Sequence, residues 1–252
     1  MDELTARRAR SFGPIADIYD RVRPGYPADA VTWLLADHER PGNPAKRVLD
    51  IGAGTGALTR DLVAMGLDVV AVEPDPAMRA VLGERVPAAD VRAGSAEDVP
   101  LDDGEVDAVL GGQMWHWVDL EPAVAEVARV LRPGGTLGLL WNFRDEHVPW
   151  MAELGAILGG DDVHGGPAQV VLPPGAPFTA RAARDFPWSQ QLARRDVVDL
   201  VSTRSHVQVL PDDERAELLQ KIGALVDSHP AVAQRARIEV PYVTSCWRAT
   251  RT

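Results

Sequence analysis

The sequence has little that suits an oxidising compartment or a membrane. Its 252 residues include a single cysteine, Cys246, which excludes an intrachain disulfide and fits a reducing compartment. Cys246 lies in an apolar run typical of a strand, which favours a buried thiol over a nucleophile. No apolar run is long enough to span a bilayer, and the N-terminus lacks a signal-peptide pattern. We therefore expect a cytoplasmic protein that has no membrane partner.

Excess positive charge and several catalytic motifs are also missing. Lys and Arg number 26 against 37 Asp and Glu, so the net charge of −11 argues against a large basic face for nucleic acid. The chain contains neither the G-x-S-x-G turn of serine hydrolases nor the G-x-x-x-x-G-K-[ST] phosphate loop. Its six histidines show no paired spacing such as H-x-x-x-H. We therefore expect no nucleic-acid partner and no metal ion.

What is present is a glycine-rich turn between a strand and a helix. Residues 48–51 form a short apolar run that predicts a buried strand, and the helical pattern after the turn ends near Gly66. Glycine lets the backbone approach a ligand closely, and a helix N-terminus offers N–H groups. The spacing is G-x-G-x-G rather than the G-x-G-x-x-G of dinucleotide sites, because residue 57 is alanine. The three glycines are Gly52, Gly54 and Gly56.

A carboxylate accompanies each of the first two predicted strands. Asp50 stands two residues before the first glycine, where it would repel a pyrophosphate and suit a ligand that carries a cation. Glu73 follows the strand predicted at 69–72 and is placed to accept hydrogen bonds from ribose hydroxyls. With the glycine spacing, a carboxylate at the position of Asp50 disfavours an NAD-dependent oxidoreductase.

Three further segments complete an ordered set. Residues 94–101 read Gly-Ser-Ala-Glu-Asp-Val-Pro-Leu, residues 131–135 read Leu-Arg-Pro-Gly-Gly, and residues 19–27 read Tyr-Asp-Arg-Val-Arg-Pro-Gly-Tyr-Pro. With the glycine turn, Asp50 and Glu73, they resemble the class I S-adenosylmethionine-dependent methyltransferases, in the small-molecule subgroup called methyltransferase type 11. The resemblance covers roughly residues 1–145 and is only a general pattern beyond them.

The resemblance implies a site for S-adenosylmethionine and its product, S-adenosylhomocysteine. Asp50 would position the amino-acid tail and Glu73 the ribose. Tyr19 and Arg23 would belong to a lid over the ligand, whereas periodicity alone fits a packed N-terminal helix equally well. The other implied cofactor residues outside the adenine loop are Gly52, Ala53, Gly54, Gly56, Pro74, Met78 and Gln113.

The adenine would lie against the loop that begins at Gly94. The family usually places Asp directly after this glycine, to accept a hydrogen bond from the adenine amino group. Here the residue is Ser95, whose hydroxyl also accepts, although more weakly than a carboxylate. The backbone of Ala96 and Glu97 would supply the remaining adenine contacts.

The methyl acceptor would lie outside the carboxyl ends of the strands, as ligands do in open parallel sheets. His116 is a candidate general base there, and an equally weighted alternative is a hydrogen-bonded packing residue. An acceptor that is already a carboxylate needs no base, and Arg23 or Arg144 would then hold the anion. The candidate acceptor residues are Trp115, Trp117, Trp141, Asn142 and Arg144, although tryptophan is also common in cores.

The expected fold is α/β, with a Rossmann-like, doubly wound sheet of seven mostly parallel strands, an antiparallel last strand and an N-terminal helical cap. We expect one domain over residues 1–252, divided into a cap (1–40), a cofactor-binding core (46–142) and acceptor-side insertions with late strands (143–252). The strands are predicted at 48–51, 69–72, 89–93, 106–110, 136–141, 186–192 and 240–248. The later helices are predicted at 121–131, 144–158, 195–203 and 212–227, and 159–177 is predicted to be a loop.

The predicted function is methyl transfer from S-adenosylmethionine to an oxygen, nitrogen or carboxylate of a small molecule. The alternatives are a non-catalytic protein that binds S-adenosylmethionine as a sensor or accessory subunit, and an enzyme that uses the sulfonium for other chemistry. The cofactor motifs are the same in all three cases. The sequence makes no prediction of the oligomeric state.

Overall fold

The computed structural model describes residue 18 and residues 21–36, 47–159 and 166–252. Most of the predicted cap, including Tyr19, lies outside the described residues. Within them, Ile18, Arg21 and Val22 are helical, as the N-terminal periodicity predicts. No helix in the described ranges is long and apolar enough to cross a membrane.

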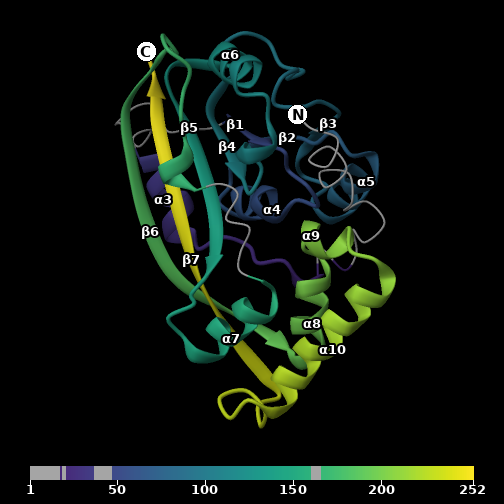
Figure 1. The fold of residues 1–252 in the computed structure, drawn as a ribbon. Helices are drawn as coiled ribbons and strands as arrows, with labels where there is room; N and C mark the ends of the chain where they lie inside the picture. The colour runs from purple at the N-terminus through teal and green to yellow at the C-terminus, as the bar shows by residue number, and fades with distance from the viewer. Residues whose placement is uncertain (1–17, 19–20, 37–46, 160–165) are drawn as a thin grey trace.

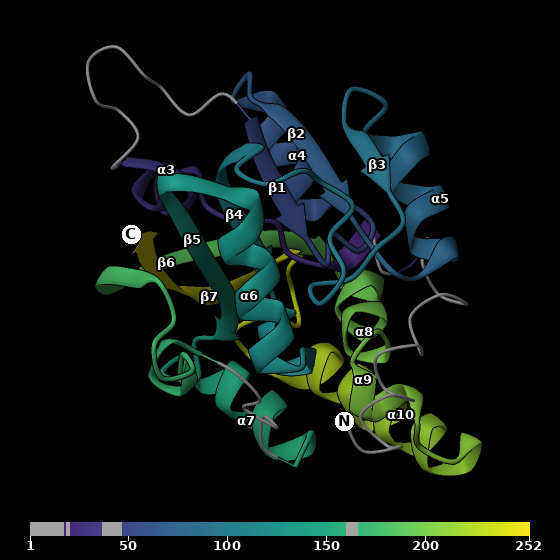
Figure 2. The ribbon, with the colours of Figure 1, turned by 90° about the horizontal axis from the view of Figure 1, so that it is seen from above.

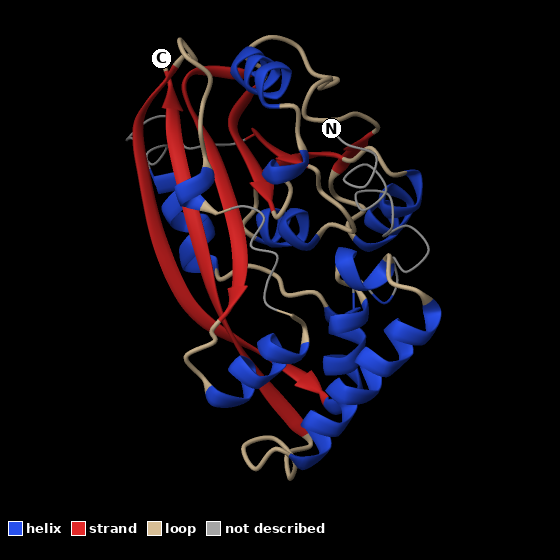
Figure 3. Ribbon diagram, viewed as in Figure 1, coloured by secondary structure: helices blue, strands red, loops and turns tan. Residues whose placement is uncertain are grey.

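Seven strands form one sheet in the order β3-β2-β1-β4-β5-β7-β6 (Figures 1 and 3). The strands β1 to β5 are parallel, and β7 runs antiparallel to both of its neighbours, β5 and β6. Their bounds are β1 (Arg47–Ile51), β2 (Asp68–Val72), β3 (Asp90–Arg92), β4 (Val106–Gly112), β5 (Leu131–Arg144), β6 (Phe178–Ala193) and β7 (Arg237–Arg251). The predicted doubly wound sheet with an antiparallel last strand is confirmed.

The helices lie in two groups. One group packs on the sheet, and the other, α7 to α10, lies beyond the end to which the parallel strands point, far from the C-terminus (Figures 1 and 2). The bounds are α3 (Ala28–Leu35), α4 (Ala57–Ala64), α5 (Pro76–Arg85), α6 (Leu120–Val130), α7 (Pro149–Ile157), α8 (Arg194–Ser202), α9 (Ser205–Gln208) and α10 (Asp212–Ser228). Two 3₁₀ turns, η3 (Trp115–Trp117) and η4 (Pro167–Gln169), complete the elements.

The central strands are apolar on both faces because helices cover both. On one face Leu49 and Val70 belong to a buried cluster with Val124 and Val127 of α6. On the other, Val48 and neighbouring strand residues pack with α3 and α4. Successive side chains of a strand point to opposite faces, so a strand buried on both sides reads as a continuous apolar run. This is why residues 48–51 and 69–72 were predictable.

A second core holds the acceptor-side helices together. Residues of α8 and α10, such as Val201 and Ile222, are buried with Leu154 of α7 and with Val240 of β7. Each apolar side chain buried in this way stabilises the fold by about 1.5–3 kcal/mol. The α7–α10 region is therefore anchored to β7 rather than attached loosely.

The late strands are longer than the sequence predicts. β6 begins at Phe178 instead of residue 186, and its first half, residues 179–185, is mostly exposed and pairs with β7 alone at the edge of the sheet. An edge strand needs no alternating apolar face, so periodicity does not reveal it. β5 begins at Leu131 instead of 136, and its register with β4 shifts between Val106 and Ala108. The helix predicted over 144–158 is confined to α7, and α9 was missed.

Candidate active site

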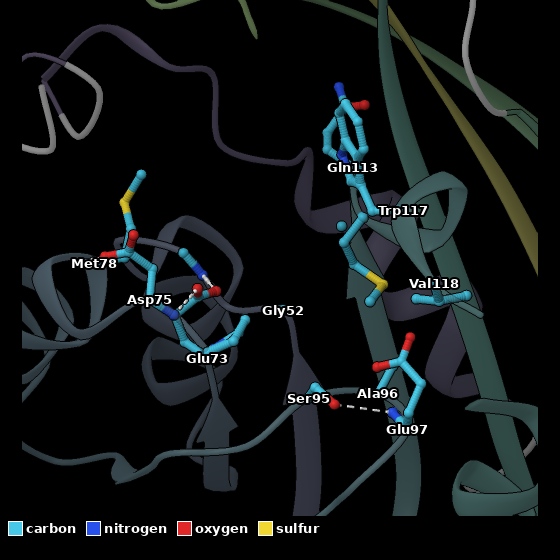
Figure 4. Close-up of a pocket in the computed structure, with 14 residues that line it drawn as sticks. Gly52, Glu73, Asp75, Met78, Ser95, Ala96, Glu97, Gln113, Trp117 and Val118 are labelled. Carbon is cyan, nitrogen blue, oxygen red and sulfur yellow. Dashed lines mark hydrogen bonds between the residues drawn. The ribbon is translucent and has the colours of Figure 1, made fainter. Parts of the chain in front are cut away.

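A cleft of about 310 Å³ lies at the carboxyl ends of β1, β2 and β4 (Figure 4). Open parallel sheets bind their ligands at this edge. This volume falls within the range of small-molecule sites. We call it the main cleft. Its lining residues are Gly52, Gly54, Glu73, Pro74, Asp75, Met78, Ser95, Ala96, Glu97, Gly112, Gln113, Met114, Trp117 and Val118.

Glu73 is fixed between two backbone donors at one side of the main cleft. Its Oε2 accepts a hydrogen bond from the Gly54 N–H at 2.9 Å, and its Oε1 accepts one from the Asp75 N–H at 2.8 Å. Each carboxylate oxygen can accept more than one bond, so Glu73 keeps capacity for a ligand donor. Burial raises the pKa of Glu73, against the effect of these two donors. The side chain is thus a preorganised acceptor of the kind that ribose hydroxyls require.

Asp50 lies deeper, under the glycine turn, and is 1% exposed. Its Oδ2 accepts a hydrogen bond from the Thr59 hydroxyl at 2.6 Å. Burial raises the pKa of Asp50 to about 7, and the nearby Glu73 carboxylate adds to the shift. A buried carboxylate with this pKa ionises readily when a cation enters beside it. Asp50 therefore suits a cationic ligand group, as the sequence analysis predicts.

The three glycines of the turn have different surroundings. Gly54 has a φ of +59°, and a Cβ built on it would meet no atom within 4 Å. A Cβ on Gly56, at φ +92°, would lie 2.3 Å from Cδ1 of Leu82. Gly54 thus borders the open cleft, whereas Gly56 lets α4 pack on α5 and does not line the cleft.

The loop after β3 forms another wall of the main cleft. The Ser95 hydroxyl accepts a hydrogen bond from the Glu97 N–H at 3.3 Å (Figure 4). Oε1 of Glu97 accepts one from the Asp119 N–H at 2.8 Å. Gly94 itself does not line the cleft. Glycine is needed at this position because a Cβ would lie 2.7 Å from Cδ of Pro100. Its conformation folds the loop so that the next three residues face the ligand space.

A second space, the middle cavity, adjoins the main cleft over Asp50. The two share four lining residues, Gly52, Gly54, Gly112 and Gln113. Tyr26 closes one side, and a Cβ on Gly112 would lie 2.3 Å from its hydroxyl oxygen, so glycine is required there. The lining residues of the middle cavity are Arg23, Pro24, Tyr26, Asp50, Gly52, Ala53, Gly54, Thr55, Ala57, Leu58, Gly112, Gln113 and Asn142.

A third space, the arginine cavity, extends from the middle cavity toward α8. The two share Arg23, Pro24, Gln113 and Asn142. Its lining residues are Arg23, Pro24, Gln113, Asn142, Arg144, Leu154, Val197, Leu200, Val201, Arg204, Val240 and Tyr242. Among the described residues, three of this lining are arginines and none is acidic, whereas the main cleft is lined by three carboxylates and no Lys, Arg or His. The charge of the wall changes sign along the continuous space.

Gln113 lines all three spaces. Its φ of +58° is uncommon for a residue with a side chain and costs of order 1–3 kcal/mol. Its N–H donates to the Leu140 carbonyl at 2.8 Å, and its Nε2 donates to the Asn142 carbonyl at 3.1 Å. A strained residue that is held by β5 at the junction of three cavities is a candidate functional residue.

Asn142 is held by a chain of partly buried hydrogen bonds. The indole N–H of Trp188 donates to the Thr244 hydroxyl at 2.8 Å, and this hydroxyl donates to Oδ1 of Asn142 at 2.5 Å. Nδ2 of Asn142 then donates to the Gly25 carbonyl at 2.9 Å. The amide therefore positions the segment that carries Arg23 and Tyr26 over the carboxyl edge of the sheet.

Replacing Thr244 with valine is expected to lower the free energy of unfolding by about 1–3 kcal/mol, because Trp188 and Asn142 lose buried partners while the volume is kept. Urea unfolding measures the change. The matched control is Thr250→Val on the same strand, which is half-buried and should change stability by less than about 0.5 kcal/mol. Equal effects of the two substitutions would contradict a structural role for the hydrogen-bond chain.

His116, Trp115 and Trp141 do not line any of these three spaces. They line a separate cavity together with Val118. Val118 also lines the main cleft, whose lining includes Ala96 and Glu97 but not Asp50. Trp141 and Asn142 are neighbours on β5, so their side chains point to opposite faces and both cannot face one ligand. Of the three tryptophans predicted to contact the acceptor, Trp117 alone lines the main cleft.

Some residues of the site carried no sequence signal. Arg204 and Tyr242 come from the α8–α9 turn and from β7, which the chain brings to Gln113 only through tertiary packing. Tyr26 stands between two prolines of the N-terminal segment, in a motif that was identified, but its contact with Gly112 required the fold. Among the described residues, no cluster of His, Cys, Asp and Glu could hold a metal ion.

The comparisons with known proteins agree with this geometry. A family model described as a methyltransferase domain matches residues 49–139. An uncharacterized methyltransferase of Mycobacterium tuberculosis is 48% identical over 242 residues, which cover 95% of each chain. An uncharacterized methyltransferase-like protein of Schizosaccharomyces pombe is 33% identical over 243 residues, which cover 94% of this chain and 93% of its own.

A solved structure from Anaeromyxobacter dehalogenans, provisionally described as a type II methyltransferase, has the same fold. It superposes with a TM-score of 0.63 at 23% identity and covers 91% of this chain and 97% of that one. The two sequence relatives extend over nearly the whole chain, so the similarity includes the α7–α10 region as well as the glycine turn. The chain therefore belongs to the class I methyltransferases.

Proposed function

We propose that the protein binds S-adenosylmethionine in the main cleft and middle cavity and transfers its methyl group to a small-molecule acceptor. The charge of the walls carries this proposal. In the part of the chain that the structure describes, the main cleft presents Glu73, Asp75 and Glu97 and no basic residue, and Asp50 lines the adjoining cavity. Such walls repel a pyrophosphate and accept a nucleoside with a cationic tail, so they fit S-adenosylmethionine better than NAD.

Each part of the site has a proposed role. Glu73 accepts hydrogen bonds from the ribose hydroxyls, and Asp50 pairs with the ammonium of the tail. Ser95, Ala96 and Glu97 contact the adenine, which packs on Met78, with Pro74 and Trp117 at the sides. Arg23 lies on the other side of the middle cavity and would pair with the tail carboxylate. Gly52, Ala53 and Gly54 supply the close backbone approach.

When bound, the cofactor supplies an electrophilic methyl group on a sulfonium cation. The residues of this chain therefore mainly have to align the acceptor, an effect that can reach about 7–11 kcal/mol. Gln113, at the junction of the three cavities, is the proposed orienting residue. Residues 143–252, the part of the domain predicted to hold the acceptor-side insertions and late strands, would then help to bind the acceptor.

The direct test incubates the protein with S-adenosylmethionine labelled on its methyl group and a pool of small metabolites, then separates small molecules from macromolecules. Label in a member of the metabolite pool, with S-adenosylhomocysteine formed in equal amount and both dependent on the intact chain, is the expected result. A sensor or accessory protein would bind the cofactor without moving label, and an enzyme of other sulfonium chemistry would consume it with the methyl group retained on sulfur or lost to water.

We expect His116→Ala to change kcat by less than about threefold on any acceptor identified in this way, because His116 lies in a separate cavity. A general base contributes typically 10²–10⁴-fold. A loss of that size, with S-adenosylhomocysteine affinity unchanged, would show that His116 reaches the acceptor after all. Trp33→Phe is the control substitution, since Trp33 of α3 lines none of the four cavities and stacks on Arg248.

A further inference from the structure

We propose that the arginine cavity binds an oxyanion group of the methyl acceptor, a carboxylate or a phosphate, through Arg144 and Arg204. The acceptor would thus be an anionic small molecule with an apolar part. The identification of the bound anion as a methyl acceptor rests on the proposed function, whereas the binding of an anion in this cavity does not.

The first argument is the continuity of the site. The arginine cavity shares Arg23, Gln113 and Asn142 with the middle cavity, and Gln113 also lines the main cleft. A molecule in the arginine cavity is therefore separated from a ligand of the main cleft by Gln113 and not by a wall of the core. The two spaces are therefore placed to hold the two reactants of one reaction and are not two independent binding sites.

The second argument is charge. Arg144 lines the cavity wall with 4% of its side chain exposed, and it forms an ion pair with Glu146 at 3.1 Å, whose own side chain is 46% exposed. Arg204 and Arg23 contribute two more positive charges to the same wall. Arg23 also donates to the hydroxyl and carbonyl oxygens of Thr203, which are neutral. Positive charge gathered in a partly dry space attracts anions strongly, and guanidinium groups match the geometry of carboxylate and phosphate.

The third argument is the shape and the remaining lining. The free space is about 30 Å³, enough for one small polar group rather than a whole acceptor. Val197, Leu200 and Val201 of α8 form the apolar side of this space, opposite Tyr242 of β7. An oxyanion at the arginines fits the size of this space, and the apolar body of the acceptor would extend out of it past the α8 side chains toward Gln113.

The test is calorimetric titration of the full chain with paired probes, with and without saturating S-adenosylhomocysteine. The anions are hexanoate, benzoate, adipate and hexyl phosphate, and the neutral partners are hexanamide, benzamide, adipamide and hexanol. At least one anion is expected to bind about tenfold more tightly than its neutral partner. Arg204→Gln and Arg144→Gln should each weaken that anion by about tenfold to a hundredfold, the effect of losing one charge-assisted hydrogen bond.

The matched control is Arg215→Gln on α10, where the arginine pairs with Asp212 and lines none of the cavities. It should leave anion affinity unchanged. Arg144 is buried, so its variant is first checked by thermal unfolding, and Arg204→Gln carries the test if that variant is unfolded. The proposal is overturned if no anion binds better than its neutral partner, or if Arg204→Gln and Arg215→Gln behave alike. Failure of S-adenosylhomocysteine to bind would instead overturn the proposed function. Anion binding is also measured without S-adenosylhomocysteine, so the two failures are distinguishable.

Discussion

Asp50→Asn is expected to weaken the binding of S-adenosylhomocysteine by at least about a hundredfold, because the ligand ammonium then enters a buried site without its counter-charge. The internal control is 5′-methylthioadenosine, which has the same nucleoside and no amino-acid tail. Its affinity should change little, since Glu73 and the adenine loop are untouched. Calorimetric titration of both ligands against wild type and variant measures the difference. Equal losses for the two ligands would show that Asp50 shapes the site without pairing with the tail.

The pH dependence of binding follows from the same carboxyl. The ordinary pKa of Asp is 3.8, and burial raises the pKa of Asp50 to about 7 in the ligand-free protein. Below pH 7 the site must release a proton before it can pair with the ammonium, so affinity for S-adenosylhomocysteine should fall by up to about tenfold per pH unit. Above pH 7 it should be flat. Asp50→Asn should abolish this dependence between pH 5 and pH 7, and a wild-type profile that is flat over the same interval would contradict the assignment.

Asp50 should also affect stability. Because its folded pKa lies above its unfolded one, the folded state holds an extra proton between about pH 4 and pH 7, and the free energy of unfolding falls as pH rises through this interval. Above pH 7 the full penalty of the buried charge remains. Asp50→Asn is therefore expected to stabilise the ligand-free protein at pH 8 by roughly 2–4 kcal/mol, and to have no such effect near pH 4. A variant less stable than wild type at pH 8 would contradict the burial argument.

The second large effect separates two glycines of one turn. Gly56→Ala should lower the free energy of unfolding by about 2–4 kcal/mol, because the new methyl group overlaps the buried Leu82 and the backbone φ is positive. Once folded, this variant should bind S-adenosylhomocysteine nearly as wild type does, since residue 56 does not line the cleft.

Gly54→Ala is the matched substitution, at a similar φ but with open space around the new methyl group. Its stability should fall by only about 1–2 kcal/mol, the cost of the left-handed backbone, while affinity for S-adenosylhomocysteine falls at least about tenfold. Urea unfolding and calorimetry of both variants give the two comparisons. If both variants lost affinity equally at full folding, the division into a ligand-facing and a packing glycine would be wrong.

The cofactor half could be predicted because its signals are local. A strand, three glycines and a carboxylate two residues earlier fix their own geometry within ten residues, and strands buried on both faces read as apolar runs. The position of Glu73 after β2 follows from the same rule that places ligands at the carboxyl ends of parallel strands. The roles of Asp50 and Glu73 in binding stay predictions, but the structure brings the two residues to adjoining spaces.

The acceptor half could not be predicted because its residues meet only through tertiary packing. The first half of the edge strand β6 has no alternating pattern. Arg204 comes to line the same cavity as Gln113 only through the packing of α8 on β7. The prediction for His116 and Trp141 rested on their positions at the carboxyl edge of the sheet. It did not consider the 3₁₀ turn η3, which carries His116, or the alternation of side chains along β5, which carries Trp141. Alternation alone would have separated Trp141 from Asn142.

The most direct measurement for the whole account is calorimetric titration of the purified protein with S-adenosylhomocysteine and, separately, with NAD. The negatively charged wall of the main cleft and the buried Asp50 predict micromolar binding of S-adenosylhomocysteine and no binding of NAD. Binding of NAD without S-adenosylhomocysteine would contradict the account, because it would mean that a pyrophosphate is tolerated beside Asp50 and Glu73.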